Sequence, residues 1–249
     1  VGKYAQTFGY SYSGGMYSPG YTPAIDGQWD NLYSALTQYR KMESLYNEEN
    51  DTQKAQDEAF MLAAKVQLYD FFAATVDIFG DMPFSKACTL PLTNDVNGSY
   101  APYDKAEDIY RTILGELKEI APRFRLVTVP KNFSTQDFIN LGNMEKWERY
   151  ANSLRLRLAM RVATQGALQE EGRAAIKEML ENPAGYPLVE EQENNIFIIN
   201  QKSGQLNFTA GSGLGDWTTN RLASGAIIDR MLSHGNYDMN SSDPQSGVY

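Results

Sequence analysis

The sequence predicts an all-α fold of helical hairpins joined by long irregular loops, with little β-strand. Apolar residues recur every three or four positions in several separate stretches, which is the spacing of one face of a helix. Glycine and proline gather between these stretches, where they end helices and favour loops. β-branched residues cluster at 196–199, which is the one candidate strand.

The first part of the chain predicts a loop followed by two helices. Residues 1–25 combine glycine, serine and proline with several aromatic side chains and lack helical spacing, so they predict an aromatic-rich loop. Asp26 is expected to cap a helix that runs to about Asn47. Asn50 is expected to cap a second helix, with Gln53 reaching back to the cap. Because this second helix is apolar on most faces, we expect it at the centre of a bundle.

The later helices are predicted from capping residues and prolines in the same way. Asp104, with Glu107 three residues later, is expected to cap a helix that Pro122 ends. Asn143 is expected to cap the next helix, in which Trp147 begins an apolar face. Three further elements are expected: a shorter helix between Gly166 and Pro183, an irregular segment over 184–217 and a helix over about 219–233. The side chains predicted to be largely buried are Phe71, Phe72, Trp147 and Leu154.

The hairpins are expected to pack like tetratricopeptide units without forming a strict repeat. Trp29 followed by Leu32 is similar to the start of such a unit. The later positions of that pattern do not match at a period of about 34 residues. The sequence therefore predicts hairpin packing and does not predict a solenoid.

Composition excludes several classes of function. The chain of 249 residues has 22 Lys and Arg against 31 Asp and Glu, a net charge of −9 that disfavours nucleic acid as a partner. With Cys88 as the single cysteine and His234 as the single histidine, zinc clusters, Cys–His nucleophiles and intramolecular disulfides are excluded. We expect no cofactor and no metal site. The apolar segment 59–79 is interrupted by charged residues, so it predicts a buried helix and not a membrane span.

Three segments of the chain resemble the SusD/RagB family. Residues 142–161 resemble the family's helix that starts with a tryptophan, here Trp147, and continues through Ala-Asn-Ser-Leu. Residues 73–83 resemble the end of a long helix at Phe-Gly-Asp-x-Pro, and residues 103–110 resemble the capped start of the next helix. With the order of the elements, this resemblance covers most of residues 26–235.

The resemblance implies a function at the bacterial surface. Members of the family are outer-membrane lipoproteins of Bacteroidetes that deliver nutrients to SusC-like TonB-dependent transporters. It therefore implies a glycan or peptide ligand, a transporter partner and a lipid-anchored location at the cell surface. Val1 stands where family members carry a lipidated cysteine, and family members are much longer. We expect residues 1–249 to form a single SusD-like helical domain, incomplete at the C-terminus, with the lipid anchor absent from this chain.

Aromatic residues in loops are the candidate ligand-binding residues. Aromatic faces stack on the C–H faces of sugars, while polar side chains bind the hydroxyls. Tyr17, Tyr21 and Trp217 lie in predicted loops and are the candidates. The alternative for each is packing against the helical core, and for Tyr10 and Tyr12 that alternative is favoured.

The charged residues indicate structural roles, and no catalytic residue is assigned. Asp77 and Asp81 flank the end of a helix, where Asp81 is expected to accept hydrogen bonds from the backbone of its own turn. Basic residues spread around the helix that follows Asn143, so solvated or locally paired charges are expected there, and not an anion site. These basic residues are Lys146, Arg149, Arg155, Arg157 and Arg161.

The sequence thus predicts a non-enzymatic protein that captures an oligosaccharide, or less favourably a peptide, for a TonB-dependent transporter. Two alternatives stay open. An α-helical carbohydrate-active enzyme would need two carboxylates that converge in a cleft beside stacked aromatics. A helical-hairpin scaffold would bind protein segments in a groove.

Overall fold

The structure of the chain is a computed structural model that describes residues 8–10, 23–96, 100–164, 166–196 and 221–223. It divides into two compact units, which are described separately. Residues 23–201 form the helical unit, and the terminal segments 1–22 and 202–249 form the second unit. The expectation of one domain that continues past Tyr249 stays a prediction.

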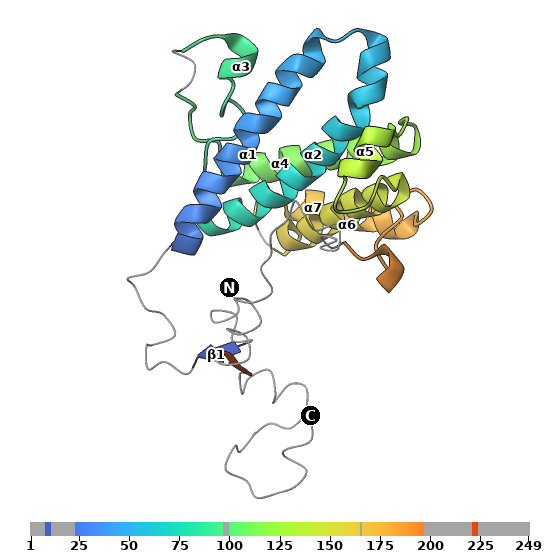
Figure 1. The fold of residues 1–249 in the computed structure, drawn as a ribbon. Coiled ribbons are helices and arrows are strands. Elements are labelled where there is room, and N and C mark those ends of the chain that lie inside the picture. Colours follow the sequence, from blue (N-terminus) through green and yellow to red (C-terminus); the bar gives the residue numbers. More distant parts are fainter. Residues whose placement is uncertain (1–7, 11–22, 97–99, 165, 197–220, 224–249) are drawn as a thin grey trace, which may run out of the picture. The chain divides into compact units, whose positions relative to one another are not determined.

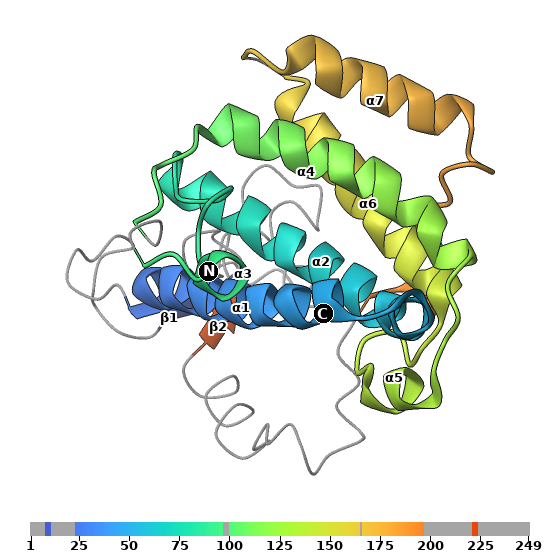
Figure 2. The ribbon, with the colours of Figure 1, turned by 90° about the horizontal axis from the view of Figure 1, so that it is seen from above.

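The helical unit begins with a long antiparallel hairpin. Helix α1 (Pro23–Glu48) and helix α2 (Asp51–Phe79) lie side by side (Figures 1 and 2). The predicted cap at Asp26 is wrong, because α1 already begins at Pro23, a residue that fits the first turn since that turn needs no amide donor. The capping box at the start of α2 is confirmed. The Asn50 side chain accepts from the Gln53 amide at 3.1 Å, and the Gln53 side chain accepts from the Asn50 amide at 3.1 Å.

The segment after α2 contains a short helix and a cap that joins residues distant in sequence. Helix α3 (Leu90–Thr93) lies within the predicted loop, and helix α4 (Ala106–Ile120) follows. The predicted cap at Asp104 is wrong, because its carboxylate accepts from the amides of Phe84 and Ser85, both at 2.9 Å. The carboxylate of Asp81 accepts from the Ala106 amide instead, at 2.8 Å. Backbone pairing of Met82 with Asp104 brings these residues together.

The C-terminal part of the helical unit is a second hairpin. The 3-10 helix η2 (Ala121–Arg125), which contains Pro122, continues from α4. Helix α6 (Met144–Val162) and helix α7 (Gln169–Glu181) pack against each other after it. The cap predicted at Asn143 is confirmed, since its side chain accepts from the Lys146 amide at 3.1 Å. Two short elements were not predicted: helix α5 (Lys131–Gln136) and 3-10 helix η3 (Gln192–Asn194).

The core of the helical unit lies between α2, α4 and α6. Trp147 is 1% exposed, and Phe72 and Leu154 are buried as predicted, whereas Phe71 is only partly buried. Within the described residues, α2 is the one helix long and apolar enough to span a membrane by length and composition. About half of its most apolar window (56%) is buried in the protein, as expected of a core helix. The predicted all-α class of helical hairpins is confirmed.

The described part of the second unit is a two-stranded ribbon. Strand β1 (Phe8–Tyr10) pairs antiparallel with strand β2 (Arg221–Ala223), with Gly9 opposite Leu222. The predicted loop over 1–25 is therefore wrong at β1 and at the start of α1, and the predicted helix over 219–233 is wrong at β2. The conformation of these residues is set by pairing between two segments distant in sequence, and such pairing overrides local propensity. The strand predicted at 196–199 lies outside the described residues except for Ile196, which is not in a strand.

Glu178 on α7 connects three elements of the helical unit. Its carboxylate accepts from Arg155 of α6 at 2.8 Å and from the Tyr186 hydroxyl at 2.6 Å, and it pairs with Lys118 of α4 at 2.6 Å. Burial disfavours the charged form of Glu178, but the hydrogen bonds from Arg155, Lys118 and Tyr186 outweigh it and lower the pKa to about 2. The ionised carboxylate therefore stabilises the folded state.

The low pKa of Glu178 predicts an acid-sensitive contribution to stability. Because the folded pKa lies below the usual value of 4.5, this contribution is complete above about pH 4.5 and is lost as the pH falls toward 2. We expect Glu178→Gln to flatten the acid side of a plot of unfolding free energy against pH. Urea titrations between pH 7 and pH 2.5 measure this slope. Glu170→Gln, on an exposed acid of the same helix, should keep the slope, and equal slopes for all three proteins would contradict the assignment.

Candidate functional site

The residues predicted from the sequence to bind the ligand lie outside the described residues. This holds for Tyr17, Tyr21 and Trp217, and also for Tyr12. Tyr10 is in strand β1. The assignment of these aromatics to a ligand site therefore stays a prediction. The candidate sites that the structure does describe are grooves on the helical unit.

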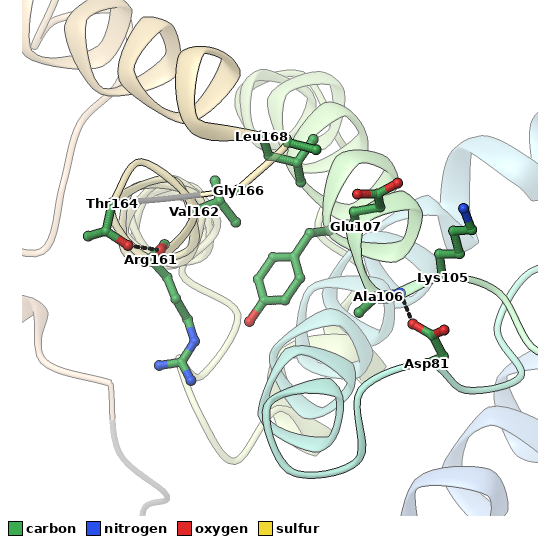
Figure 3. A pocket seen from close by; sticks show the side chains of 11 residues that line it. Asp81, Lys105, Ala106, Glu107, Arg161, Val162, Thr164, Gly166 and Leu168 are labelled. Carbon is green, nitrogen blue, oxygen red and sulfur yellow. Dashed lines mark hydrogen bonds between the residues drawn. The ribbon is translucent and has the colours of Figure 1, made fainter.

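A broad groove of about 820 Å³ lies where α4 begins and α6 ends (Figure 3). Lys105 and Glu107 line it at the start of α4, and Arg161 lines it at the end of α6. Asp81 enters from the turn after α2, and the loop between α6 and α7 closes another side with Leu168. The groove thus brings together residues from three segments distant in sequence: the turn after α2, the start of α4, and the end of α6 with the loop that follows it.

The aspartates beside this groove are already engaged in holding helices together. Asp81 accepts from the Ala106 amide, shown as a dashed line in Figure 3. Asp77 pairs with Arg161 at 2.6 Å and accepts from the Tyr110 hydroxyl. Burial and the bond to Asp77 raise the pKa of the Tyr110 hydroxyl, which therefore stays a donor. The structural role predicted for Asp81 holds, but its backbone partner is on another element and not in its own turn.

The groove offers polar contacts without an aromatic platform. Lys105 and Glu107 are exposed, and the Thr164 hydroxyl donates to the Arg161 carbonyl at 3.1 Å. The Tyr110 ring is only 8% exposed, so it presents no free face to a ligand. Such a groove can hold a polar ligand through charged donors and acceptors, but sugar stacking needs an exposed aromatic face.

A second groove, of about 500 Å³, runs between α2 and α6 and combines aromatic with polar side chains. Phe71 and Tyr150 line it and are both partly buried. The Tyr150 hydroxyl donates to the Asp70 carboxylate at 2.7 Å, and Arg157 pairs with the same carboxylate. The rings of Trp147 and Tyr150 stack with centroids 5.8 Å apart, so the core extends to the floor of this groove.

The arginines of α6 are all paired, but only Arg149 has the local partner that the sequence predicted, and the others pair with acids of α2 and α7. Arg149 pairs with Glu145, Arg155 with Glu178, Arg157 with Asp70 and Arg161 with Asp77. Lys146 donates to the Glu193 carbonyl. The sequence did not indicate that Arg155 would be buried, because its partner Glu178 lies on the next helix.

The groove residues Lys105, Asp70 and Tyr150 were not singled out from the sequence, and Glu107 was named only for the predicted cap of its helix. Asp70, Glu107 and Tyr150 lie on helices whose spacing indicates only an exposed or a buried face, and Lys105 directly precedes α4. How close they come to other elements depends on how α2, α4 and α6 pack, and no local sequence pattern predicts that packing.

Comparison with known proteins identifies a family model that matches residues 6–238, described as SusD-like and "Starch-binding associating with outer membrane". The match covers more than half of the chain and includes all three segments in which the sequence resembled the SusD/RagB family. A comparison with proteins of curated function found no match.

Solved structures share the fold at low identity. A SusD-like protein from Bacteroides thetaiotaomicron has a TM-score of 0.70 at 15% identity, over 92% of this chain and 45% of that chain. A SusD homologue from Bacteroides vulgatus has a TM-score of 0.60 at 20% identity, over 82% and 38%. One from Parabacteroides distasonis has a TM-score of 0.58 at 24% identity, over 78% and 36%. This chain thus spans less than half the length of these three proteins.

Proposed function

Because this chain belongs to the SusD-like family, we propose that it is part of a cell-surface protein that binds an oligosaccharide and delivers it to a TonB-dependent transporter in the outer membrane. A peptide is the less favoured ligand. The family model over residues 6–238 is the observation that carries the proposal. The helical-hairpin fold, shared with the SusD-like structures, is consistent with it.

The proposed role is binding without catalysis. Glycoside hydrolysis needs two carboxylates about 5 to 10 Å apart that flank a sugar, with one free to donate a proton. Beside the broad groove, Asp77 is engaged by Arg161, and Asp81 is engaged by the Ala106 amide. This geometry supports structural roles for the two aspartates, which leaves the enzyme as the weaker alternative.

A glycan array run in parallel with a hydrolysis assay tests the proposal. We expect the 249-residue chain to bind an oligosaccharide and to release no reducing ends from it. Hydrolysis of the bound glycan would favour the carbohydrate-active enzyme. Binding of peptides but of no glycan would favour the helical-hairpin scaffold.

The partner and the location are tested in the native organism. We propose a SusC-like transporter as the partner and a lipid anchor as the attachment to the cell surface. Affinity purification of the tagged protein from outer membranes should recover a TonB-dependent transporter. Recovery of the protein in the cytoplasmic fraction, without a transporter, would contradict both.

Loop aromatics are proposed to carry the ligand contacts. Trp217→Ala or Tyr17→Ala should weaken glycan binding by about 1 to 3 kcal/mol without lowering the melting temperature, because a surface ring contributes contact area to the ligand and little to the core. Tyr21→Ala is expected to act in the same direction. Calorimetric titration with the glycan found on the array measures the effect.

Tyr100→Ala is the matched control for these loop variants, since Tyr100 is a loop aromatic that is 90% exposed and lines none of the grooves described above. It should keep the affinity of the unmodified protein. Unchanged affinity in Trp217→Ala, Tyr17→Ala and Tyr21→Ala would move the site elsewhere. A matching fall in melting temperature would place these residues in the core.

A further inference from the structure

A row of three polar side chains on α6 is buried inside the helical unit. Glu148, Asn152 and Arg155 follow one another at intervals of four and three residues, which places them on the same face of the helix. Their exposed fractions are 3%, 1% and 4%. We refer to these residues as the buried polar row. They need partners inside the protein, since a buried polar group without one is costly.

Part of this row holds the chain that follows α7 against α6. The Glu148 carboxylate pairs with Arg125, and Arg125 also donates to the Ala184 carbonyl at 3.1 Å. The side-chain nitrogen of Asn152 donates to the Pro187 carbonyl, also at 3.1 Å. The polar row thus supports a segment that has no regular secondary structure of its own.

Three side-chain atoms of the row have no hydrogen-bond partner among the described residues. They are Oδ1 of Asn152 and the Nε and Nη1 atoms of Arg155. The third nitrogen of Arg155, Nη2, donates to Glu178 at 2.8 Å, and the guanidinium lies over the Tyr186 ring, 5.4 Å from its centroid. Arg155 therefore has a counterion, but three of its five N–H groups lack an acceptor.

The chemistry of these atoms selects the kind of ligand that fits them. Asn152 offers an acceptor and Arg155 offers donors, so one ligand that satisfies both must donate and accept hydrogen bonds. Water does both, whereas an anion such as chloride only accepts and would be repelled by the Asn152 oxygen. The burial of both side chains favours a ligand as small as water, since a larger one would have to separate α6 from its neighbours.

We propose that Asn152 and Arg155 form an internal water site, in which an ordered water donates to Asn152 Oδ1 and accepts from Arg155 Nε or Nη1. The two residues are three apart on α6, so their side chains are neighbours on the helix surface and one water can reach both. Globular proteins hold on the order of one buried water per 27 residues, bonded to polar groups that the protein leaves unpartnered. This water completes the contacts of the buried polar row.

A high-resolution crystal structure of the unmodified 249-residue chain tests the proposal. We expect a water within hydrogen-bond distance of Asn152 Oδ1 and of Arg155 Nε or Nη1. Soaking the crystals in sodium bromide separates water from an anion, because a bound bromide gives an anomalous peak. A bromide peak at this place would overturn the proposal. So would a protein acceptor on the Arg155 atoms, or the absence of solvent density beside them.

Magnetic relaxation dispersion of water tests the same site in solution, because its amplitude reports internal waters with long residence times. Arg155→Met removes the donors and Asn152→Leu removes the acceptor, and each variant should lower the amplitude. Arg157→Met is the matched control, since it makes the same change on α6 at a side chain that is 62% exposed, and it should keep the amplitude.

Two results in solution would contradict the water site. One is an unchanged amplitude in both Arg155→Met and Asn152→Leu. The other is an equal loss in Arg157→Met, which would mean that the signal does not come from the buried polar row. The crystal structure uses the unmodified chain, so it decides the question even if a variant fails to fold.

Discussion

Replacing Trp147 with alanine is expected to lower the free energy of unfolding by about 3 to 5 kcal/mol, the range for emptying an aromatic core site. The side chain is 1% exposed, and its ring stacks between Phe124 and Tyr150, with centroid distances of 6.1 and 5.8 Å. Truncation therefore opens a cavity where α6 meets η2, in the centre of the helical unit. Urea unfolding followed by far-ultraviolet circular dichroism measures the change.

The conservative variant Trp147→Phe provides the control for this prediction. It keeps most of the ring area and loses the indole N–H, so it should lower the free energy of unfolding clearly less than the alanine variant does. Acrylamide quenching in a Trp29→Phe, Trp217→Phe background, where Trp147 is the single emitter, should show a protected indole. A change of under about 1 kcal/mol for Trp147→Ala, together with a quenchable indole, would contradict the core assignment.

Replacing Asp137 with alanine should lower the free energy of unfolding by a similar amount, about 3 to 5 kcal/mol, because one carboxylate satisfies four donors. Its Oδ1 accepts from the amides of Ile139 and Asn140 at 2.9 and 3.0 Å. Its Oδ2 accepts from the Gly142 amide at 2.9 Å and from the Trp147 indole at 2.7 Å. Asp137 is buried, so these donors would lose their partner where water has little access.

Asp137→Asn separates the hydrogen bonds from the packing. The amide has nearly the same shape but replaces one acceptor with a donor. We therefore expect the free energy of unfolding to fall by about 1 to 3 kcal/mol. A double-mutant cycle of Asp137→Ala with Trp147→Phe should show coupling, since both changes remove the same bond to the indole. Additive effects would mean that the carboxylate stabilises only the loop whose amides it accepts from, and gains nothing from the indole.

Elements that depend on local contacts could be predicted from the sequence. The caps at Asn50 and Asn143 involve partners three residues away, and the apolar spacing of α2 and α6 follows the helix period. The start of α4 could not be predicted in the same way. Its first amide is capped by Asp81, which lies 25 residues earlier, and Asp104 is drawn to the amides of Phe84 and Ser85.

The candidate sites were predictable only as residue types. Loop aromatics could be named from composition, but the two grooves lie between helices whose packing no local sequence pattern predicts. Tyr150 shows the difficulty, because the carboxylate that accepts from its hydroxyl belongs to Asp70, which lies 80 residues earlier on another helix.

The bonds between α2 and α6 also affect how the chain folds as it is made. Asp70 of α2 meets Tyr150 and Arg157 of α6, which follow it by 80 and 87 residues. At about 5 to 20 residues per second, the ribosome needs roughly 4 to 16 seconds to add 80 residues. During that interval the apolar helix α2 can pack against α1 but not against α6, so part of its core face stays open to chaperones and to other nascent chains.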